Sequence, residues 1–129
     1  MKTPFNLLIL LLVLITSCEK NNLDATIKGN QWDIVNIKGS NSSLAGDTIQ
    51  ISVFYPTSSG CDVLDRFENT INGNTYMVRA FGHTENAACI QYAGTKSAFY
   101  KFTTTIKGTY DLRFQKKDGS FLTHTITIN

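Results

Sequence analysis

Three cysteines and two histidines are the side chains of this sequence best suited to forming or breaking bonds: Cys18, Cys61, Cys89, His83 and His124. A free cysteine beside a histidine can act as a nucleophile with its base, and cysteines together with a histidine can hold zinc. The paired C-x-x-C and H-x-x-x-H spacings of structural zinc sites do not occur. His124 falls on the apolar face of the last expected strand and His83 at a strand end, positions typical of structural histidines. We therefore expect no metal, no cofactor and no catalytic residue.

The familiar sequence signatures of enzymes are missing from the chain. It contains no G-x-S-x-G elbow, no phosphate-binding loop, no H-E-x-x-H and no dinucleotide fingerprint. Its 129 residues suffice for one domain. Lysine and arginine number 12 against 10 acidic residues, which leaves a formal charge of +2, whereas nucleic-acid-binding domains carry a clear basic excess. We expect a small non-enzymatic domain that does not bind nucleic acid.

An uninterrupted apolar run, Leu7–Ile15, follows Lys2 near the N-terminus. As a helix its nine residues would rise about 14 Å at roughly 1.5 Å per residue, whereas a bilayer core near 30 Å needs about 20 residues. The run is therefore too short to cross a membrane, and polar residues follow it from Glu19. We interpret it as the apolar core of a secretory signal peptide.

The four residues that end this segment, Ile15-Thr16-Ser17-Cys18, resemble the lipobox of bacterial lipoproteins, in which an aliphatic residue and two small ones precede a cysteine. The resemblance implies that the Cys18 thiol receives a diacylglycerol, that cleavage follows Ser17, and that the new amino group is acylated, for example with palmitate. Residues 1–17 are then the signal peptide and residues 18–28 a polar tether.

Lipidation at Cys18 fixes the expected location of the protein. Because several acyl chains hold a protein stably on a membrane, the resemblance implies a lipid-anchored protein of the bacterial cell envelope. It places the protein at the outer membrane, facing either the periplasm or the cell surface. The alternative is an ordinary secretory signal cut elsewhere, which leaves Cys18 as a free thiol.

The cysteine count supports the lipoprotein interpretation. Three cysteines leave one unpaired thiol in an exported protein, and lipidation of Cys18 leaves Cys61 and Cys89 as an even pair. In an oxidising compartment this pair is expected to form a disulfide, closing a loop of 29 residues. The bridge opposes two alternatives, a Cys61–His83 nucleophile and base and a metal site built from both cysteines and His83, because each needs free sulfur.

Beyond residue 28 the apolar residues repeat with a period of two, which is typical of β-strands. Asn72-Gly73-Asn74 and Asp118-Gly119 indicate tight turns, since Asn and Gly tolerate the positive φ that hairpin turns need. Short strands separated by such turns predict one all-β domain over residues 29–129, either an antiparallel sandwich or a small barrel. The seven expected strands are Gln31–Lys38, Thr48–Tyr55, Val63–Ile71, Thr75–Phe81, Ala98–Thr105, Thr109–Gln115 and Phe121–Ile128.

The segment Gly108-Thr109-Tyr110-Asp111-Leu112 resembles the G-x-Y-x-C segment that opens strand F of immunoglobulin-like domains. The resemblance implies an antiparallel immunoglobulin-like β-sandwich of about seven strands. It also implies a structural corner at Gly108 and Tyr110, where the tyrosine hydroxyl bonds back to the main chain. Leu112 stands where antibody domains carry cysteine, and Trp32 falls on the first expected strand rather than the third. The antibody-type disulfide and tryptophan are therefore not expected.

Two further resemblances concern the class of protein and the alternative fold. The order of lipobox, early Trp32, mid-chain Gly-Cys, second cysteine and late Gly-x-Tyr resembles that of small uncharacterised lipoproteins of the Bacteroidetes, which implies no particular activity. The alternative fold is a lipocalin-like β-barrel, because Gly29-Asn30-Gln31-Trp32 is similar to the G-x-W opening of lipocalins with one residue more.

Several polar or aromatic side chains are candidates for surface roles. An aromatic on the polar face of a strand can mark a docking surface, and the candidates for such a contact patch are Phe54, Arg79 and Phe121. Asp47-Thr48-Ile49 resembles the O-glycosylation sequon of Bacteroidetes envelope proteins, so Thr48 is a candidate for glycosylation.

An acidic series offers carboxylates at a spacing of three: Asp62, Asp65 and Glu68. Carboxylates are calcium ligands when they converge. On a regular strand Asp62 and Glu68 share one face and Asp65 points to the other, so these residues are expected to form a solvated acidic edge and not a calcium site.

These features predict a lipid-anchored, non-enzymatic cell-envelope module. Its partners are the membrane, through the lipid anchor, and an envelope protein or glycan, in an interaction or structural role. The alternative is a small-ligand carrier with a lipocalin-like barrel cavity. An apolar pocket open at one end would favour the carrier, whereas a filled core between two sheets would exclude it.

Overall fold

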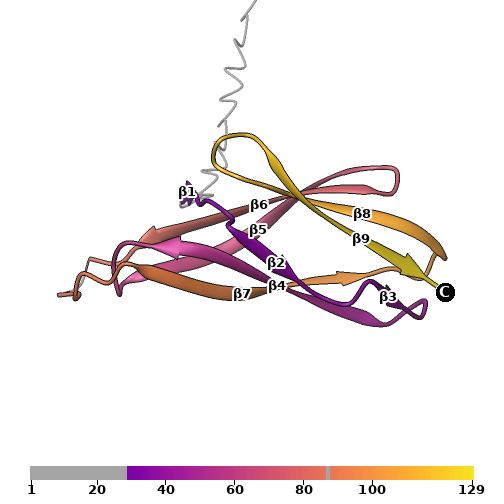
Figure 1. Cartoon of the computed structure of the whole chain (residues 1–129), viewed down its shortest axis with the longest axis horizontal. Helices are drawn as coiled ribbons and strands as arrows, with labels where there is room; N and C mark the ends of the chain where they lie inside the picture. Colours follow the sequence, from indigo (N-terminus) through magenta and orange to yellow (C-terminus); the bar gives the residue numbers. More distant parts are fainter. Residues whose placement is uncertain (1–28, 87) are drawn as a thin grey trace, which may run out of the picture.

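The computed structural model describes residues 29–86 and 88–129, which fold into an all-β structure without a helix (Figure 1). Strands account for 64% of this part of the chain, which confirms the predicted all-β class. The expected signal peptide, the tether and Cys18 lie outside the described residues. The strands of the described part are β1 (Asn30–Gln31), β2 (Asn36–Lys38), β3 (Ser42–Ser43), β4 (Thr48–Thr57), β5 (Asp62–Asn72), β6 (Thr75–Thr84), β7 (Gly94–Thr103), β8 (Gly108–Gln115) and β9 (Phe121–Ile128).

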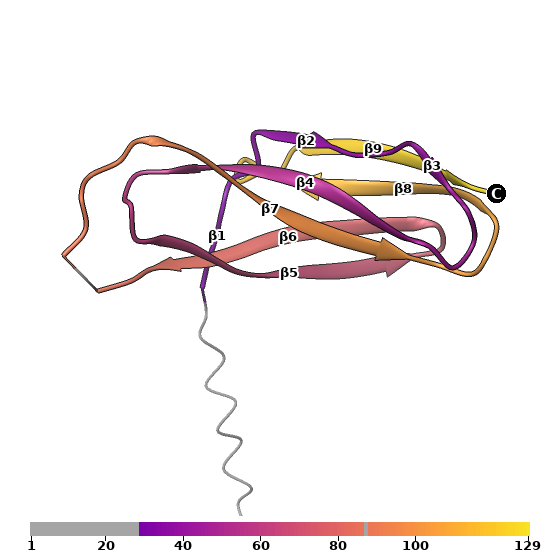
Figure 2. The ribbon, with the colours of Figure 1, turned by 90° about the horizontal axis from the view of Figure 1, so that it is seen from below.

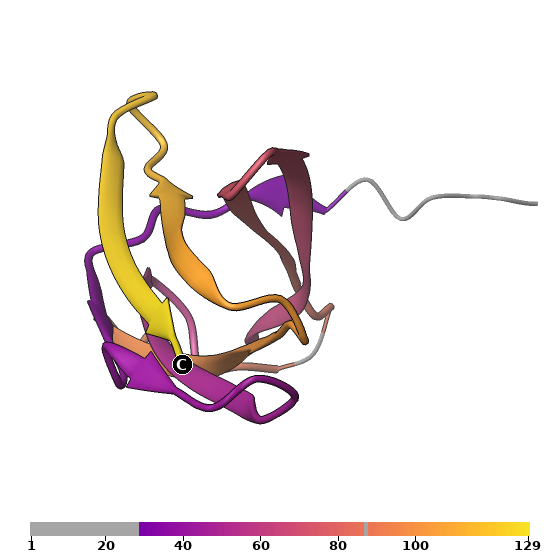
Figure 3. The same cartoon turned by 90° about the vertical axis from the view of Figure 1, so that its right-hand side faces the viewer.

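The strands form two sheets. The three-stranded sheet has the order β2–β4–β7, and the six-stranded sheet has the order β1–β6–β8–β9–β3 with β5 paired to β6. Seen from its end in Figure 3, the sheet that holds β8 and β9 (orange and yellow) lies across from β4 (purple). The two sheets do not close into a barrel. The lipocalin-like alternative is therefore wrong.

A filled hydrophobic core lies between the sheets. Alternate residues of β4 point inward, and Ile51 and Val53 are fully buried, as the period-two pattern predicts. Leu112 and Phe114 of β8 face them from the other sheet and are also fully buried. Burying each such side chain stabilises the fold by about 1.5–3 kcal/mol. Edge-to-face ring contacts between the two sheets complete the core, for example Tyr100 with Phe67 and Phe114 and Tyr76 with Phe102.

The expected first strand, Gln31–Lys38, is in fact two strands in different sheets. β1 pairs with β6 in the six-stranded sheet, whereas β2 pairs with β4 in the three-stranded sheet. The segment between them crosses the sandwich with Ile34 fully buried. Its amides stay paired on both sides, because Trp32 donates to Ala80 and Val35 donates to Phe54. A hydrophobic pattern cannot reveal this crossing, because Ile34 is buried on either interpretation.

Two strand pairs are parallel, which corrects the expectation of a purely antiparallel sandwich. β6 runs parallel to β8, and β3 runs parallel to β9. The chain reaches β8 from β6 through β7, which belongs to the opposite sheet. It therefore crosses the sandwich twice and returns in the direction of β6.

A β-bulge at Asp65 reverses the alternation within β5. Leu64 pairs with Gly82 and Arg66 pairs with Phe81, so Asp65 has no partner in the ladder. An extra residue of this kind turns the following side chains to the opposite face. Leu64 and Phe67 consequently both pack on the core. The bulge also corrects the predicted geometry of the acidic series, because Asp62 and Glu68 lie on opposite faces of the sheet.

A tyrosine closes the connection between β7 and β8. The Tyr110 hydroxyl donates a hydrogen bond of 2.8 Å to the carbonyl of Ile106, four residues earlier, and the Tyr110 side chain is buried. Gly108, at the start of β8, has φ of +145°, a backbone conformation that other residues rarely adopt. The geometry is that of a tyrosine corner, in which a hydroxyl fixes the loop preceding its own strand.

Tyr110→Phe should lower the free energy of unfolding by about 1 kcal/mol, because the ring remains but the Ile106 carbonyl loses its partner. For a domain of this size the melting temperature should fall by about 4–8 °C. Thermal unfolding followed by circular dichroism measures the change. Tyr92→Phe is the matched control, since Tyr92 is 49% exposed and its variant should melt as the wild type does. Equal melting temperatures for the two variants would show that the corner contributes nothing.

Candidate interaction face

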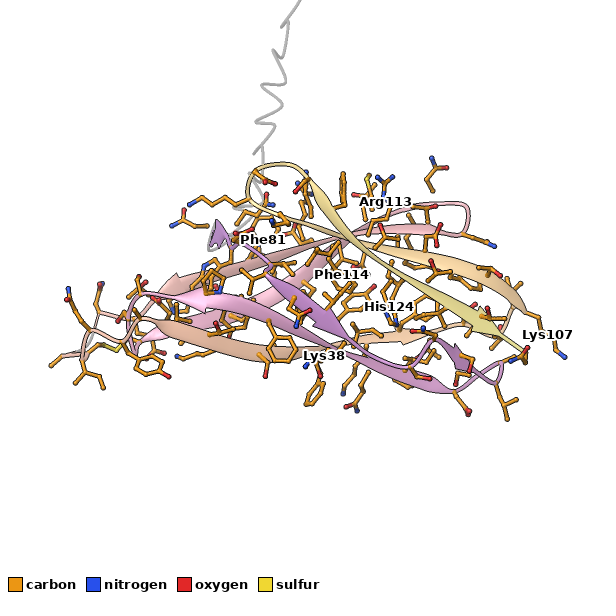
Figure 4. All side chains as sticks on the ribbon, in the orientation of Figure 1. Lys38, Phe81, Lys107, Arg113, Phe114 and His124 are labelled. Atoms are coloured by element: carbon orange, nitrogen blue, oxygen red, sulfur yellow. A yellow bond between two sulfur atoms is a disulfide. The ribbon has the colours of Figure 1, made fainter. Side chains whose placement is uncertain are left out.

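All three arginines of the sequence lie on the outer face of the six-stranded sheet. Arg79 alternates on β6 with Val78 and Ala80, which are fully buried, so its side chain points outward. The register aligns Arg66 of β5 with Phe81 of β6, and Arg113 of β8 with Met77 of β6. Figure 4 shows Arg113 on the outer side of this sheet and Phe114, the next residue, between the sheets.

The guanidinium groups stack on two phenyl rings of the same surface. Arg66 and Arg79 lie 4.9 and 5.6 Å from the centre of the Phe81 ring, and Arg113 lies 4.4 Å from the centre of the Phe121 ring. Such cation–π contacts contribute about 0.5–1 kcal/mol each at exposed sites. They also hold the planar groups in position. We name these five residues the arginine face.

Glu68 is the carboxylate that lies among the cations. Its carboxylate is 2.7 Å from the Arg66 guanidinium and 3.8 Å from that of Arg79. One carboxylate thus forms ion pairs with two guanidinium groups. All three side chains are more than a third exposed. In the part of the chain that the structure describes, no ion pair involves Arg113. The outward carboxylate of β8, Asp111, accepts a hydrogen bond of 2.7 Å from Thr125.

This surface has the chemistry to bind oxyanions. A guanidinium presents paired N–H donors that match the two oxygens of a carboxylate, sulfate or phosphate. Three of them on adjacent strands, about 4.8 Å apart from strand to strand, form a short row across the sheet. Thr123 and Thr125 continue the same face onto β9 and add hydroxyl groups. The arrangement suits a ligand that carries several negative charges along its length.

The predicted contact patch does not exist as one surface. Arg79 and Phe121 lie on the outer face of the six-stranded sheet, but Phe54 lies on the outer face of the three-stranded sheet. There the Lys38 ammonium is 5.6 Å from the centre of the Phe54 ring. The prediction was wrong because period-two alternation tells which face of a strand a residue takes but not which sheet the strand joins.

Sequence reasoning missed Arg66, Phe81 and Arg113. Alternation alone places Phe81 beside Arg79 on β6 and turns Arg113 outward on β8, so both could have been found. Arg66 could have been found as well, because it alternates with Glu68 and Thr70 on the polar side of the expected strand Val63–Ile71. In the structure Asp62 and Leu64 point inward, so regular alternation from Asp62 would bury Arg66. The bulge at Asp65 brings it to the surface.

A disulfide joins Cys61 to Cys89, with 5.7 Å between their Cα atoms, and confirms the predicted pair. It links the β4–β5 and β6–β7 connections, which Figure 2 shows together at the end of the sandwich opposite the C-terminus. Because the Cys61 sulfur is bonded, a Cys61–His83 nucleophile and base and a metal site using both sulfurs are wrong. His83 instead lies 2.7 Å from the Asp65 carboxylate, and His124 lies 3.0 Å from the Ser40 carbonyl.

The acidic residues of β5 have separate partners. Asp65 contacts His83, and Glu68 contacts Arg66 and Arg79, as described above. Within residues 29–86 and 88–129 no three His, Cys, Asp or Glu side chains are grouped so that they could hold a metal ion. Thr48, the candidate glycosylation site, is exposed at the start of β4, and its hydroxyl is 2.8 Å from that of Thr103.

Asp62 is a buried carboxylate, 5% exposed. It accepts hydrogen bonds from the Thr84 hydroxyl at 2.6 Å and from the amides of Ser58 and Ser59 at 2.8 and 3.0 Å. The Thr84 bond first, then the two amides and the Lys96 ammonium, hold the pKa of Asp62 below its ordinary value of 3.8, although burial opposes them. The carboxylate therefore anchors the loop before β5 in its ionised form.

The stability of the fold should fall with acidification as Asp62 is protonated. Because the folded pKa is depressed, this stabilisation is complete above the ordinary pKa and is lost as the pH falls through the folded value. Melting temperatures measured between about pH 5 and pH 2 should decline less steeply in Asp62→Asn than in the wild type. The exposed Asp47→Asn is the control and should follow the wild-type curve. Parallel curves for wild type and Asp62→Asn would contradict the assignment.

Comparison of the chain with models of known families, with curated proteins and with solved structures finds no match. Among the residues that the structure describes, no helix is long and apolar enough to cross a membrane.

Proposed function

We propose that the protein is a lipid-anchored, non-enzymatic module of the bacterial cell envelope that binds an acidic polysaccharide through the arginine face. The observation that carries the proposal is the gathering of every arginine of the sequence on one sheet face, stacked on Phe81 and Phe121. No lysine lies on the strands of this face, although the chain has nine lysines. The strands of this face carry guanidinium groups and no ammonium groups. We therefore infer that the face recognises paired oxygen atoms and does not simply attract negative charge.

A polysaccharide fits this face better than a folded protein does. Protein interfaces are built around a core of exposed apolar and aromatic side chains, whereas the rings of the arginine face lie under guanidinium groups. Around them the same face carries threonines, Glu68 and one exposed apolar side chain, Met77. A linear chain of uronic or sulfated sugars would pair its anionic groups with successive arginines and its hydroxyls with the threonines.

We propose further that the sandwich belongs to the immunoglobulin-like group. The hydrogen bond from Tyr110 to Ile106 and the division of the strands into two facing sheets support this assignment. The parallel pairing of β6 with β8 departs from the group's antiparallel sheets. The tyrosine corner therefore supports this assignment more strongly than the arrangement of the strands does.

The membrane anchor follows from the lipobox resemblance at Ile15–Cys18. In a bacterial host, mass spectrometry of the purified wild type should find an N-terminal Cys18 carrying acyl chains, and Cys18→Ser should abolish acylation and release the protein from the membrane fraction. Ser17→Ala is the control, because a small residue before the cysteine is retained, and this variant should stay membrane-bound. A mature N-terminus other than Cys18 would contradict the anchor.

The binding proposal is tested with soluble protein, residues 18–129 carrying Cys18→Ser. Isothermal titration with polygalacturonate, in which every sugar carries a carboxylate, should give saturable binding, and neutral dextran should give none. A sulfated polysaccharide distinguishes recognition of carboxylate from recognition of sulfate. Equal binding of polygalacturonate and dextran, or binding of neither acidic polymer, would contradict the proposal.

A further inference from the structure

A pocket opens where β1, the end of β4, the start of β5 and the end of β6 meet, and none of its lining residues belongs to the arginine face. Its volume is about 380 Å³, within the range of roughly 300–1,000 Å³ typical of small-molecule sites. Its wall includes Gln31, Trp32, Thr57, Asp62 and Lys117. It thus combines one aromatic side chain with amide, hydroxyl, carboxylate and ammonium groups, a lining suited to a small polar ligand.

The Thr57 hydroxyl is a buried group without a hydrogen-bond partner in the described part of the chain. Thr57 is 6% exposed, and its Oγ1 is the one buried side-chain nitrogen or oxygen of the described residues that makes no hydrogen bond. Buried polar groups nearly always have a partner, so this hydroxyl, on the wall of the pocket, retains its hydrogen-bonding capacity for a ligand.

The Asp62 carboxylate retains capacity for a ligand as well. Its Oδ2 accepts from two backbone amides, but its Oδ1 accepts only from Thr84 among the hydrogen bonds described above. A carboxylate has about four acceptor positions, which leaves one on Oδ1. A hydroxyl donor in the pocket could occupy it.

The charges around the pocket are balanced. Asp33 and Asp62 provide two carboxylates on its wall. Lys117 lines the same wall, and the Lys96 ammonium donates to the Asp62 carbonyl at 2.7 Å. Two negative and two positive groups favour neither an anion nor a cation. The ligand that fits is neutral and rich in hydroxyls.

The geometry points to a neutral sugar unit as the occupant of this pocket. Its hydroxyls donate to Asp62 Oδ1 and pair with the Thr57 hydroxyl. Its apolar ring face packs on Trp32, whose indole is held in place by an edge contact with Tyr55 at 5.2 Å between ring centres. The inference is independent of the arginine face, because the two surfaces share no residue.

The test is a nuclear magnetic resonance titration of the soluble Cys18→Ser chain with neutral methyl glycosides of glucose, galactose, mannose and N-acetylglucosamine. At least one should shift the backbone amides of Thr57, Asp62 and Thr84 and the Trp32 indole N–H in a saturable way. Thr57→Val keeps the side-chain volume without the hydroxyl and should weaken that binding about tenfold. Thr57→Ser, which keeps the hydroxyl, should bind as the wild type does.

Thr95→Val, an exposed threonine of β7, is the matched control and should leave the affinity unchanged. A dispersed amide spectrum of Thr57→Val confirms that this variant is folded. The inference is overturned if no glycoside gives saturable shifts, if the shifts map outside the pocket, or if Thr57→Val binds as tightly as the wild type. Binding of the charged glucuronate in preference to every neutral glycoside would also overturn it.

Discussion

Removing the disulfide by Cys61→Ser with Cys89→Ser should lower the melting temperature by roughly 14–28 °C. In the chain-entropy description, a bridge closing a loop of this length stabilises a fold by about 3.5 kcal/mol. Each kcal/mol corresponds to about 4–8 °C in a domain of this size. The β4–β5 and β6–β7 connections that it joins share few backbone hydrogen bonds, notably Gly60 to Ile90 and Glu85 to Cys61. Without the bridge this end of the sandwich should open first.

Thermal unfolding of the wild type with and without a reducing agent measures the same effect without mutation. Reduction should lower the wild-type melting temperature and leave that of the double variant unchanged, which separates loss of the bridge from any effect of the serines. Membrane attachment of the full chain should not change. A reduced wild type that melts within a degree or two of the oxidised protein would show that the bridge does not stabilise the fold.

The second large effect concerns the arginine face. Arg66→Ala, Arg79→Ala and Arg113→Ala combined should weaken binding of polygalacturonate by about 100-fold. This assigns about 1 kcal/mol to each exposed charge-assisted hydrogen-bonding group. The free energy of unfolding should fall by about 2–4 kcal/mol at most, because the variant loses three cation–π contacts of about 0.5–1 kcal/mol each and exposed ion pairs such as Arg66–Glu68, which contribute less than about 1 kcal/mol. Isothermal titration of both proteins measures the affinity ratio.

The matched control removes the same number of charges elsewhere. Lys38 and Lys101 lie on the outer face of the three-stranded sheet and Lys107 in the β7–β8 connection. Replacing all three lysines with alanine gives the same net charge as the arginine variant and should keep nearly the wild-type affinity. If the two variants lose affinity equally, net charge and not the arginine face accounts for binding. Replacing the arginines with lysine should give an intermediate affinity, since charge remains but paired donation is lost.

Much of this fold follows from local pattern. The alternation in Thr48–Tyr55 and Thr109–Gln115 predicts which residues of β4 and β8 enter the core, and Gly73 and Gly119 occupy the turns expected of them. Local pattern does not predict where the chain changes the strand or the sheet with which it pairs. The crossing at Ile34 and the bulge at Asp65 depend on contacts with β4 and β6, which are distant in sequence.

The arginine face, like the fold, is only partly predictable from local pattern. The sequence predicts Arg79 and Phe121 as contact residues because each lies on the polar side of an expected strand. Phe54 met the same criterion but belongs to the other sheet, since sheet membership is decided by pairing across the whole chain. Arg66 joins the face only through the bulge. A surface built from four strands could therefore be predicted residue by residue in part, but its assembly could not.

The most direct test of the central claim observes the arginine side chains themselves. The chain contains three arginines, so a proton–nitrogen correlation spectrum has three Nε–Hε signals, each assignable by single Arg→Lys substitution. Titration with short galacturonate oligomers should shift all three signals saturably, together with the backbone amides of Phe81 and Phe121. Unmoved Nε–Hε signals, or shifts confined to the Lys38–Phe54 surface of the opposite sheet, would contradict the claim that the arginine face is the binding site.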